Sequence, residues 1–350
     1  MKNRMFALLC LCLLVMNLAG PTVADVPAKR KAKAQTNQLA HLLPATDGIV
    51  TLDVKRFFSI ALPKVLSANQ PMLDKITVKV ESVKSRTGID IRQFDALVAG
   101  ITAKQISPKK YDLDHVVIAR GQVSSASIIG AARLAVNGKY REEKAGGTTI
   151  YIVSAKDVAA QINQTAPVAA KPDLIDKLIG KQSGELALAA VDANTIAFGE
   201  PELVRQTVNG VATVKSDLIP LLAKRETSVI SFAGKMPNGM SGFLPLDNDE
   251  LGRNIDSIRY VYGDMDIAGD AATLNVTART LQNTQATALK EALEGAQIFL
   301  KALLGGSKGQ DKQVYARMIE NAKFSSSGNE VMLNLQVPQS DIDILVAGLK

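Results

Sequence analysis

The sequence has two cysteines, two histidines and no tryptophan in 350 residues, and aromatic side chains make up only 4% of it. Both cysteines, Cys10 and Cys12, lie in an apolar run near the N-terminus, so a chain that lost this leader would contain no thiol. That would exclude a disulfide scaffold, and stability would have to come from a hydrophobic core, which a chain of this length can bury. The shortage of aromatic rings disfavours a stacking platform for bases or sugars.

The shortage of histidine and cysteine also removes the usual ligands of zinc and iron and the commonest general base. His41 is expected in a mobile tail, and His115 follows Asp112 and Asp114 without a recognisable nucleophile. The nearest match to a nucleophile elbow, residues 239–243, lacks the final glycine. We therefore predict a protein that is not an enzyme, with no catalytic residue, metal or cofactor.

Three short patterns resemble functional motifs but have the wrong context. Residues 107–110 match S-x-x-K, yet a proline and two lysines place them in a strand connection. Residues 247–250 offer carboxylate oxygens without the alternate spacing of a calcium loop. The glycine-rich segment 305–309 follows a helix, so it is expected to end that helix and not to bind phosphate.

The N-terminus has the pattern of a secretory signal. Lys2 and Arg4 precede an unbroken apolar run over residues 5–16, and small residues follow as far as Ala24. We predict a signal peptide over residues 1–24, because the apolar run is shorter than the roughly 20 residues that a membrane-spanning helix needs. An uncleaved anchor is the alternative. The expected localisation is outside the cytoplasm, either periplasmic or secreted.

The formal charge of +7 is concentrated at the same end of the chain. Residues 1–33 carry five of these charges, which leaves +2 for the rest. Because the body has no basic stripe, we do not expect a nucleic-acid partner. Residues 25–41 are predicted to be a flexible basic tail, and weak contact with an anionic membrane surface is the alternative role of its cluster Lys29, Arg30, Lys31 and Lys33.

Two strands followed by a helix recur four times in the remaining sequence. The predicted units are residues 96–101, 115–120 and 124–136; 185–191, 195–198 and a helix from Pro201; 259–267, 271–280 and 284–304; and 324–327, 330–337 and a helix from Ser340. The units differ in length and share no motif, so the recurrence is structural. It predicts an α+β fold, with antiparallel sheets covered by helices.

The third hairpin is regular enough to predict its register. A turn at Gly269-Asp270 places Ile267 opposite Ala272 and gives one apolar face, so a slip of one residue would scramble both faces. The other face carries Tyr260, Tyr262, Arg279 and two aspartates, Asp264 and Asp266, all of which we expect in contact with solvent.

Two helices are predicted to cover sheet faces. In residues 284–304 the apolar positions recur at three- and four-residue steps and end with Phe299, Leu300 and Leu303. In residues 72–83 the same spacing is followed by a stop at Gly88.

Two further segments allow local predictions. Residues 42–58 are interpreted as the first strand and helix of a non-catalytic body, with Lys55 and Arg56 at most in surface ion pairs. Tyr140 and Tyr151 fall on the same face of a hairpin around Gly146-Gly147. A stabilising aromatic contact is the favoured interpretation, and half of a ligand shelf is the alternative.

The chain is predicted to contain two α+β domains, residues 42–212 and 227–350. The segments 161–172 and 235–249 are interpreted as long connectors, rich in proline and glycine or alanine. The second keeps Phe243 among other apolar residues, which makes Phe243 a candidate contact residue.

Three stretches resemble a loose group of uncharacterised bacterial secreted and cell-envelope proteins. They are Leu43-Pro44 through Phe58, the element Thr87-Gly88-Ile89-Asp90, and the strand-to-helix joint from Phe198 to Val204. The resemblance implies an α+β fold outside the cytoplasm, and it transfers no active residue.

These observations favour a non-enzymatic binding protein that acts through a sheet face and loops. The candidate contact residues are Tyr260, Tyr262, Arg279 and Phe243, and the partner is an unidentified protein or apolar ligand. A carrier for an apolar small molecule or lipid, and a hydrolase with an unrecognised site, are the alternatives.

Overall fold

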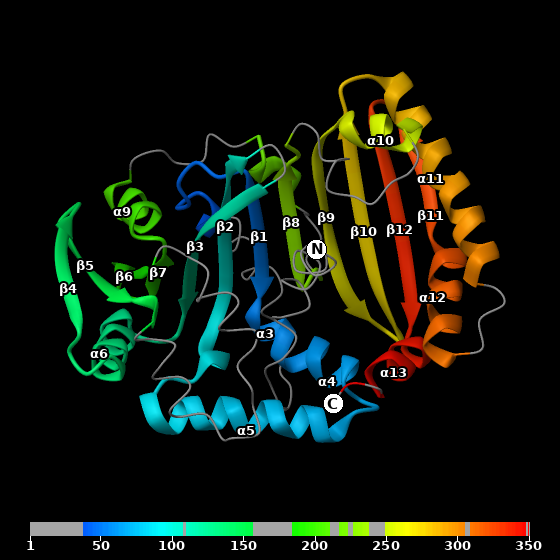
Figure 1. Cartoon of the computed structure of the whole chain (residues 1–350). Helices are drawn as coiled ribbons and strands as arrows, with labels where there is room; N and C mark the ends of the chain where they lie inside the picture. Colours follow the sequence, from blue (N-terminus) through cyan, green and yellow to red (C-terminus); the bar gives the residue numbers. More distant parts are fainter. Residues whose placement is uncertain are drawn as a thin grey trace. The chain divides into compact units, whose positions relative to one another are not determined.

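A computed structural model describes residues 38–107, 110–156, 184–210, 217–222, 227–237, 249–304, 309–347 and 349. The chain divides into two compact units (Figure 1). We call residues 34–51 and 82–219 the N-terminal unit, and residues 52–81 and 220–350 the C-terminal unit. The predicted signal peptide, most of the predicted tail, the segment 161–172 and Phe243 lie outside the described residues.

The N-terminal unit contains a sheet of antiparallel strand pairs. Its strands follow one another in space as β1 (Gly48–Asp53), β2 (Phe94–Ser107), β3 (Lys110–Gly121), β7 (Thr195–Gly199), β6 (Glu185–Asp192), β5 (Thr148–Ser154) and β4 (Tyr140–Ala145). The pairs from β2 to β4 are all antiparallel, and the last two residues of β1 already belong to the C-terminal unit. The helices are α6 (Ser125–Ala135), α9 (Pro201–Asn209) and the 3₁₀ turn η3 (Ile91–Gln93), and the 3₁₀ turn η4 (Ile219–Leu221) begins at the last residue of this unit and ends in the other.

The C-terminal unit has a second group of antiparallel strands, in the order β11 (Lys323–Ser327), β12 (Glu330–Pro338), β10 (Ala271–Thr280), β9 (Ile258–Ala268) and β8 (Ile230–Lys235). Its helices are α3 (Val54–Arg56), the π-helix η2 (Phe57–Ala61), α4 (Leu62–Val65), α10 (Asp249–Asp256), α11 (Asn283–Leu304), α12 (Gln310–Asn321) and α13 (Gln339–Ala347). Helix α5 (Gln70–Thr87) begins in this unit and ends in the other.

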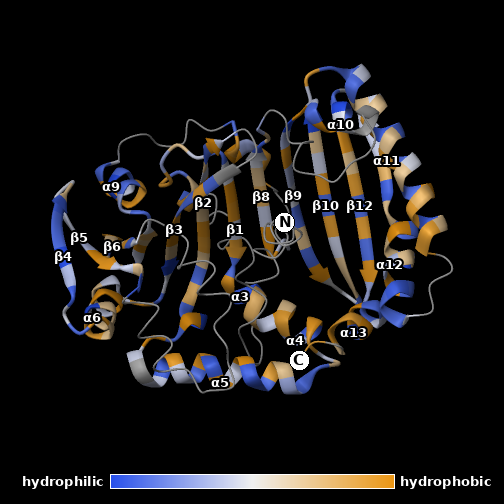
Figure 2. Ribbon diagram, in the orientation of Figure 1, coloured by the Kyte–Doolittle hydropathy of each residue, from blue (hydrophilic) through white to orange (hydrophobic). Residues whose placement is uncertain are grey.

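The predicted strand-strand-helix units are all present, as β2-β3-α6, β6-β7-α9, β9-β10-α11 and β11-β12-α13. The register predicted for the third hairpin is confirmed from Ala272 opposite Ile267 to Arg279 opposite Tyr260. Figure 2 shows hydrophilic and hydrophobic residues alternating along β10 and β12. Two helices, α10 and α12, were not predicted, although Val314 and Met318, and Tyr315 and Ile319, recur in α12 at the four-residue step of a helix.

Gly263 shows how closely these strands pack. It lies opposite Val276 on β10 and Phe232 on β8. A Cβ at this position would lie 2.0 Å from the backbone oxygen of Asn275 and 3.0 Å from Cζ of Phe232. The site therefore excludes every side chain, and the ring of Phe232 occupies the space beside the glycine.

The predicted exposure of Asp264 and Asp266 is wrong, because both are buried. Ser228 Oγ donates to Asp264 Oδ2 at 3.0 Å. Asp266 accepts at 3.3 Å from Arg56 Nη2, and the side chains of that pair are only 10% and 15% exposed. The sequence suggested that Arg56 lies on the surface. It is instead the partner of a buried carboxylate 210 positions away along the chain.

The α+β class is confirmed, but the prediction that helices cover the sheets is not. At the N-terminal half of α11, Ala286 and Leu289 pack with Val331 of β12 into a buried core cluster. Phe299, Leu300 and Leu303, which we expected on the covered face, are exposed. The spacing of apolar residues indicates that a helix is amphipathic, but it does not indicate where the surface that the helix covers comes to an end.

The packed part of the chain begins before residue 42. Residues 38–40 form a helical turn in which Leu39 and Ala40 are fully buried, and His41 follows on the surface. Residues 52–81 group with the C-terminal unit, whereas we had placed them in the first domain. Asn69 helps to hold them there, because its Nδ2 donates to the carbonyl oxygens of Val346 at 2.7 Å and Leu349 at 3.1 Å.

Asp90, in the Thr87-Gly88-Ile89-Asp90 element, caps η3 and binds a guanidinium with both oxygens. Its Oδ1 accepts from Arg92 N at 3.0 Å and from Arg92 Nε at 2.8 Å, and Oδ2 accepts from Arg92 Nη2 at 2.7 Å. These bonds, opposed by partial burial, lower the pKa of Asp90 to about 2. Lys84 adds an ion pair at 3.3 Å.

Asp90→Asn should lower the free energy of unfolding by about 1 kcal/mol at neutral pH, because the charge-assisted bonds are lost while one capping oxygen remains. Since the pKa of Asp90 is depressed in the folded protein, its contribution is complete above the unfolded value, near 4, and is lost as pH falls towards 2. Urea unfolding of both proteins from pH 7 to pH 2 measures this. A stability difference that stayed constant across that range would contradict the assignment.

Arg56→Ala should destabilise the protein by about 3 kcal/mol, because it leaves the carboxylate of Asp266 buried without its cation. The matched control is the adjacent Lys55→Ala, which removes an exposed side chain and should change stability by less than about 0.5 kcal/mol. Thermal and urea unfolding of the two variants measure the difference. Equal effects would show that the Arg56–Asp266 pair has no special role.

Candidate functional site

The predicted contact residues Tyr260, Tyr262 and Arg279 lie on one face of the sheet of the C-terminal unit. Cross-strand register places Tyr260 opposite Arg279 and Tyr262 opposite Thr277, and it extends the same face to Glu330 on β12. We call this surface, formed by alternate residues of β9, β10 and β12, the polar sheet face. All three predicted residues are partly buried.

Glu330 joins two of the three predicted residues, and sequence reasoning missed it. Its Oε1 accepts from the Tyr262 hydroxyl at 2.7 Å and from Arg279 Nε at 2.8 Å. The Arg279 guanidinium also lies 5.4 Å from the centre of the Tyr262 ring. Burial, then the bond to Glu330, raises the pKa of Tyr262, so the hydroxyl remains a donor at neutral pH. The pairing of Glu330 with Arg279 follows from the β10–β12 register, which no local pattern indicates.

A second row of hydrogen bonds crosses the polar sheet face. Asn334 Nδ2 donates to Asn275 Oδ1 at 2.7 Å, and Asn275 Nδ2 donates to Asp264 Oδ1 at 3.4 Å. Exposure increases along this row, from buried Asp264 through partly buried Asn275 to exposed Asn334. The polar sheet face is therefore anchored on the β9 side and open to solvent on the β12 side.

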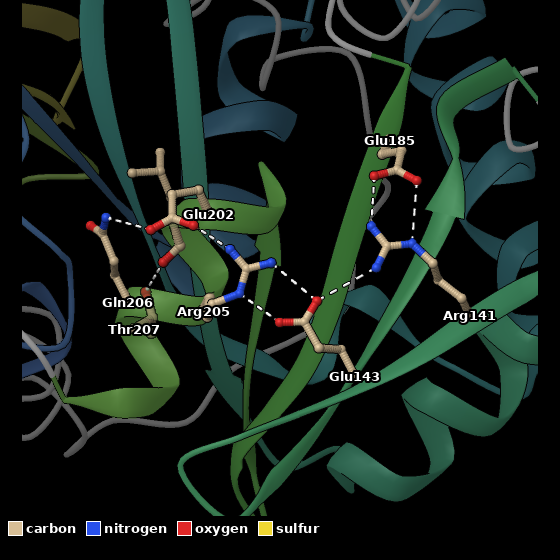
Figure 3. Close-up of polar contacts among 8 residues, drawn as sticks. Arg141, Glu143, Glu185, Glu202, Arg205, Gln206 and Thr207 are labelled. Atoms are coloured by element: carbon tan, nitrogen blue, oxygen red, sulfur yellow. Dashed lines mark hydrogen bonds and ion pairs between the residues drawn. The ribbon is translucent and has the colours of Figure 1, made fainter.

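The N-terminal unit has a different polar cluster, drawn in Figure 3. Arg205 of α9 donates to both oxygens of Glu143 on β4, at 2.6 and 3.1 Å, and also pairs with Glu202. Arg141 of β4 pairs with Glu143 at 3.5 Å and with Glu185 of β6 at 2.9 Å. We call this alternating row of charges the β4 clamp, because it fastens the last strand of the sheet to α9 and β6.

The chemistry of the β4 clamp is structural. The bond from Arg205, opposed by desolvation, lowers the pKa of Glu143, so this carboxylate stays ionised and paired. The charges of the clamp are directed at one another (Figure 3) and not at a common empty point. The pair Glu202–Arg205 has the three-residue spacing of a helix ion pair, the only part of the clamp that the sequence alone could have suggested.

The tyrosine pair is confirmed on one face of the β4–β5 hairpin. The rings of Tyr140 and Tyr151 meet edge to face, with their centroids 5.7 Å apart. Arg133 of α6 lies over both rings, at 5.0 and 5.4 Å, and its Nε donates to the Tyr140 hydroxyl at 2.8 Å. Because Arg133 of the same chain packs over both rings, the tyrosine pair is an internal contact that joins α6 to the hairpin.

Of the candidate catalytic and metal-binding patterns, residues 108–109, 239–243, 247–248 and 305–308 lie outside the described residues. His115 lies inside β3, and burial lowers its pKa, an effect that Glu200 and Asp114 oppose. Asp114 forms an ion pair with Lys104. No three His, Cys, Asp or Glu side chains converge as a metal site among these residues.

Glu143→Gln should loosen β4 without unfolding the unit, because it removes the central charge of the clamp. We expect faster amide hydrogen exchange in Tyr140–Ala145 and little change in global stability, as is usual for solvent-accessible ion pairs. Gln206→Ala is the control, since Gln206 Nε2 donates to the outer member Glu202 at 3.0 Å. Unchanged exchange in β4 would mean that its hydrogen bonds to β5 suffice.

Comparison with known proteins gives no family assignment. No family model and no curated protein sequence matches the chain. Crystal structures of a protein named TP0453 are similar at low level: form IV has 9% identity and a TM-score of 0.42, covering 91% of this chain and 99% of the other. Form III has 9% identity and a TM-score of 0.41, with 89% and 98% covered.

Proposed function

We propose that this chain is a non-enzymatic binding protein, exported to the periplasm or secreted, that contacts a protein partner through the polar sheet face. The predicted signal peptide and the resemblance to envelope proteins support the location. As a separate finding, none of the described helices has the length and hydropathy that a membrane crossing requires.

The observation that carries the proposal is the fixed geometry of Tyr262 and Arg279. Both are held by Glu330 while remaining partly exposed. Tyrosine and arginine are the side chains most often found at the energetic centres of protein interfaces. A side chain that is already held in place loses less conformational entropy when a partner binds, so more of the contact energy appears as affinity.

The solvent exposure of the residues on the polar sheet face also supports its role as the binding surface. Asn334 and Gln336 continue the polar sheet face on β12 and are exposed, whereas Asp264 is buried. A partner could therefore reach β12 and the Tyr262–Arg279 pair without opening the core. Phe243 remains a predicted contact residue.

A variant with Tyr260→Ala and Arg279→Ala should bind a partner from envelope extracts of the source organism at least tenfold more weakly, which is about 1.4 kcal/mol. Arg141→Ala, which removes an exposed arginine from the N-terminal unit, is the matched control and should bind as the unaltered protein does. Quantitative mass spectrometry of captured proteins gives the ratio, and circular dichroism checks that each variant is folded. A variant that captured the same partner to the same extent would exclude this surface.

A carrier for an apolar molecule is a second candidate, and one observation favours it. On the opposite side of the same strands, Leu274, Val276, Leu333 and Leu335 are only partly buried. Native mass spectrometry of gently purified protein would reveal a co-purifying lipid as added mass. Turnover in an esterase, peptidase or glycosidase panel, abolished by one point mutation, would instead support the hydrolase alternative.

A further inference from the structure

The C-terminal half of α11 presents a large apolar surface. Ile298, Phe299 and Leu303 are 72%, 67% and 64% exposed, whereas Ala286 and Leu289 near the start of the same helix are fully buried. The helix lies beside α12 in Figure 1, and Gln297 fixes this contact by donating to the carbonyl oxygens of Ile319 and Ala322, at 2.5 and 2.8 Å. The exposed residues therefore belong to a helix that is held in place.

These side chains form one continuous strip. At 100° per residue, Gly295, Ile298, Phe299, Ala302 and Leu303 fall within an arc of about 140°. Between Gly295 and Leu303 the arc contains no charged residue, and Glu291, one turn before Gly295, is the exposed charge at its N-terminal end. The charges beside the arc are paired inside the chain, Glu294 with Lys290 and Lys301 with Glu320. We call these five residues the α11 strip.

Gly295, in the α11 strip, has no function within its own chain that the contacts reveal. A glycine in a helix interior costs about 1 kcal/mol relative to alanine. A Cβ on Gly295 would nevertheless meet no atom of the described chain within 4 Å. A small residue within an apolar strip is the arrangement that lets the backbone of a second helix approach closely.

We propose that the α11 strip binds the same strip of a second copy of this chain, with the two helices antiparallel about a two-fold axis near Phe299. In this register each Leu303 lies over Gly295 of the second copy, so the largest gap receives a branched side chain. Lys301 lies opposite Gln297 and Glu294 opposite Leu304, so no like charges meet. A two-fold interface requires such a self-complementary surface.

The charges of α11 favour a protein partner over a lipid surface. Its two lysines, Lys290 and Lys301, are balanced by Glu291 and Glu294. Helices that lie on membranes usually carry an excess of lysine and arginine on the polar side, often with tryptophan, which this chain lacks. The strip is small, on the order of 400 Å² per copy and about half of a standard interface, so the dimer should be weak.

The inference goes beyond the proposed binding function and uses a different surface. The core cluster shows that α11 covers the apolar side of β10 and β12. Pairing through the α11 strip would leave the polar sheet face of both copies open. A partner would then meet two copies of that face on one particle, which strengthens binding through multivalency.

Sedimentation velocity of the full chain, from about 5 to about 500 µM, should show reversible dimerisation. Gly295→Leu should weaken the dimer at least tenfold, because it fills the gap that Leu303 occupies. It should also raise the melting temperature, since leucine favours helix and its Cβ would meet no atom of the described residues within 4 Å. Loss of the dimer therefore cannot be attributed to misfolding.

Thr287→Leu is the control, since it adds an apolar side chain at an exposed position in the first half of α11 and should leave dimerisation unchanged. An unaltered protein that stays monomeric throughout, or a Gly295→Leu variant that dimerises equally well, would overturn the proposal. So would flotation of a monomeric protein with phosphatidylglycerol vesicles that Phe299→Glu abolishes, because a lipid surface would then be the occupant. Binding of a partner to the polar sheet face is measured separately, so either proposal can fail alone.

Discussion

Strand β10 lies between β9 and β12, and the C-terminal unit depends on the register of these three strands. Each residue of β10 is matched with one residue on both sides over most of its length. The alternation of polar and apolar residues therefore coincides in all three strands, and a shift of one residue would put Asn275 and Arg279 into the core. Gly263 strengthens this constraint, because only glycine fits between Asn275 O and the ring of Phe232.

The same register creates both of the surfaces for which we propose a role. On one side it brings Tyr262, Arg279 and Glu330 together, and on the other it builds the cluster on which Ala286 and Leu289 of α11 pack. Helix α11 continues past the residues that pack on this cluster, so its C-terminal turns do not contact it. The polar sheet face and the α11 strip thus follow from one strand arrangement together with one helix length.

The predictable part of this structure was local. The β9–β10 register was predictable from the turn at Gly269-Asp270 and the alternation on both sides of it. Both signals lie within one short hairpin, so no distant segment is needed to read them. Contacts between distant segments were not predictable from one sequence. Asp266 alternates with apolar neighbours and so looked exposed, and only the folded chain brings Arg56 to it. Glu330 was missed for the same reason, while Tyr262 and Arg279 were found because they belong to one hairpin.

The β4 clamp has a consequence for the behaviour of the N-terminal unit in concentrated solution. Strand β4 is the last strand of its sheet, and its outer edge offers backbone groups to which another polypeptide could add. Arg141 and Glu143 place ionised groups on this edge strand, directed at α9 and β6, and a chain that packed over them would have to strip water from them. The ion pairs that hold β4 to α9 therefore also discourage sheet-to-sheet aggregation, a protection that a purely apolar attachment of this strand would not provide.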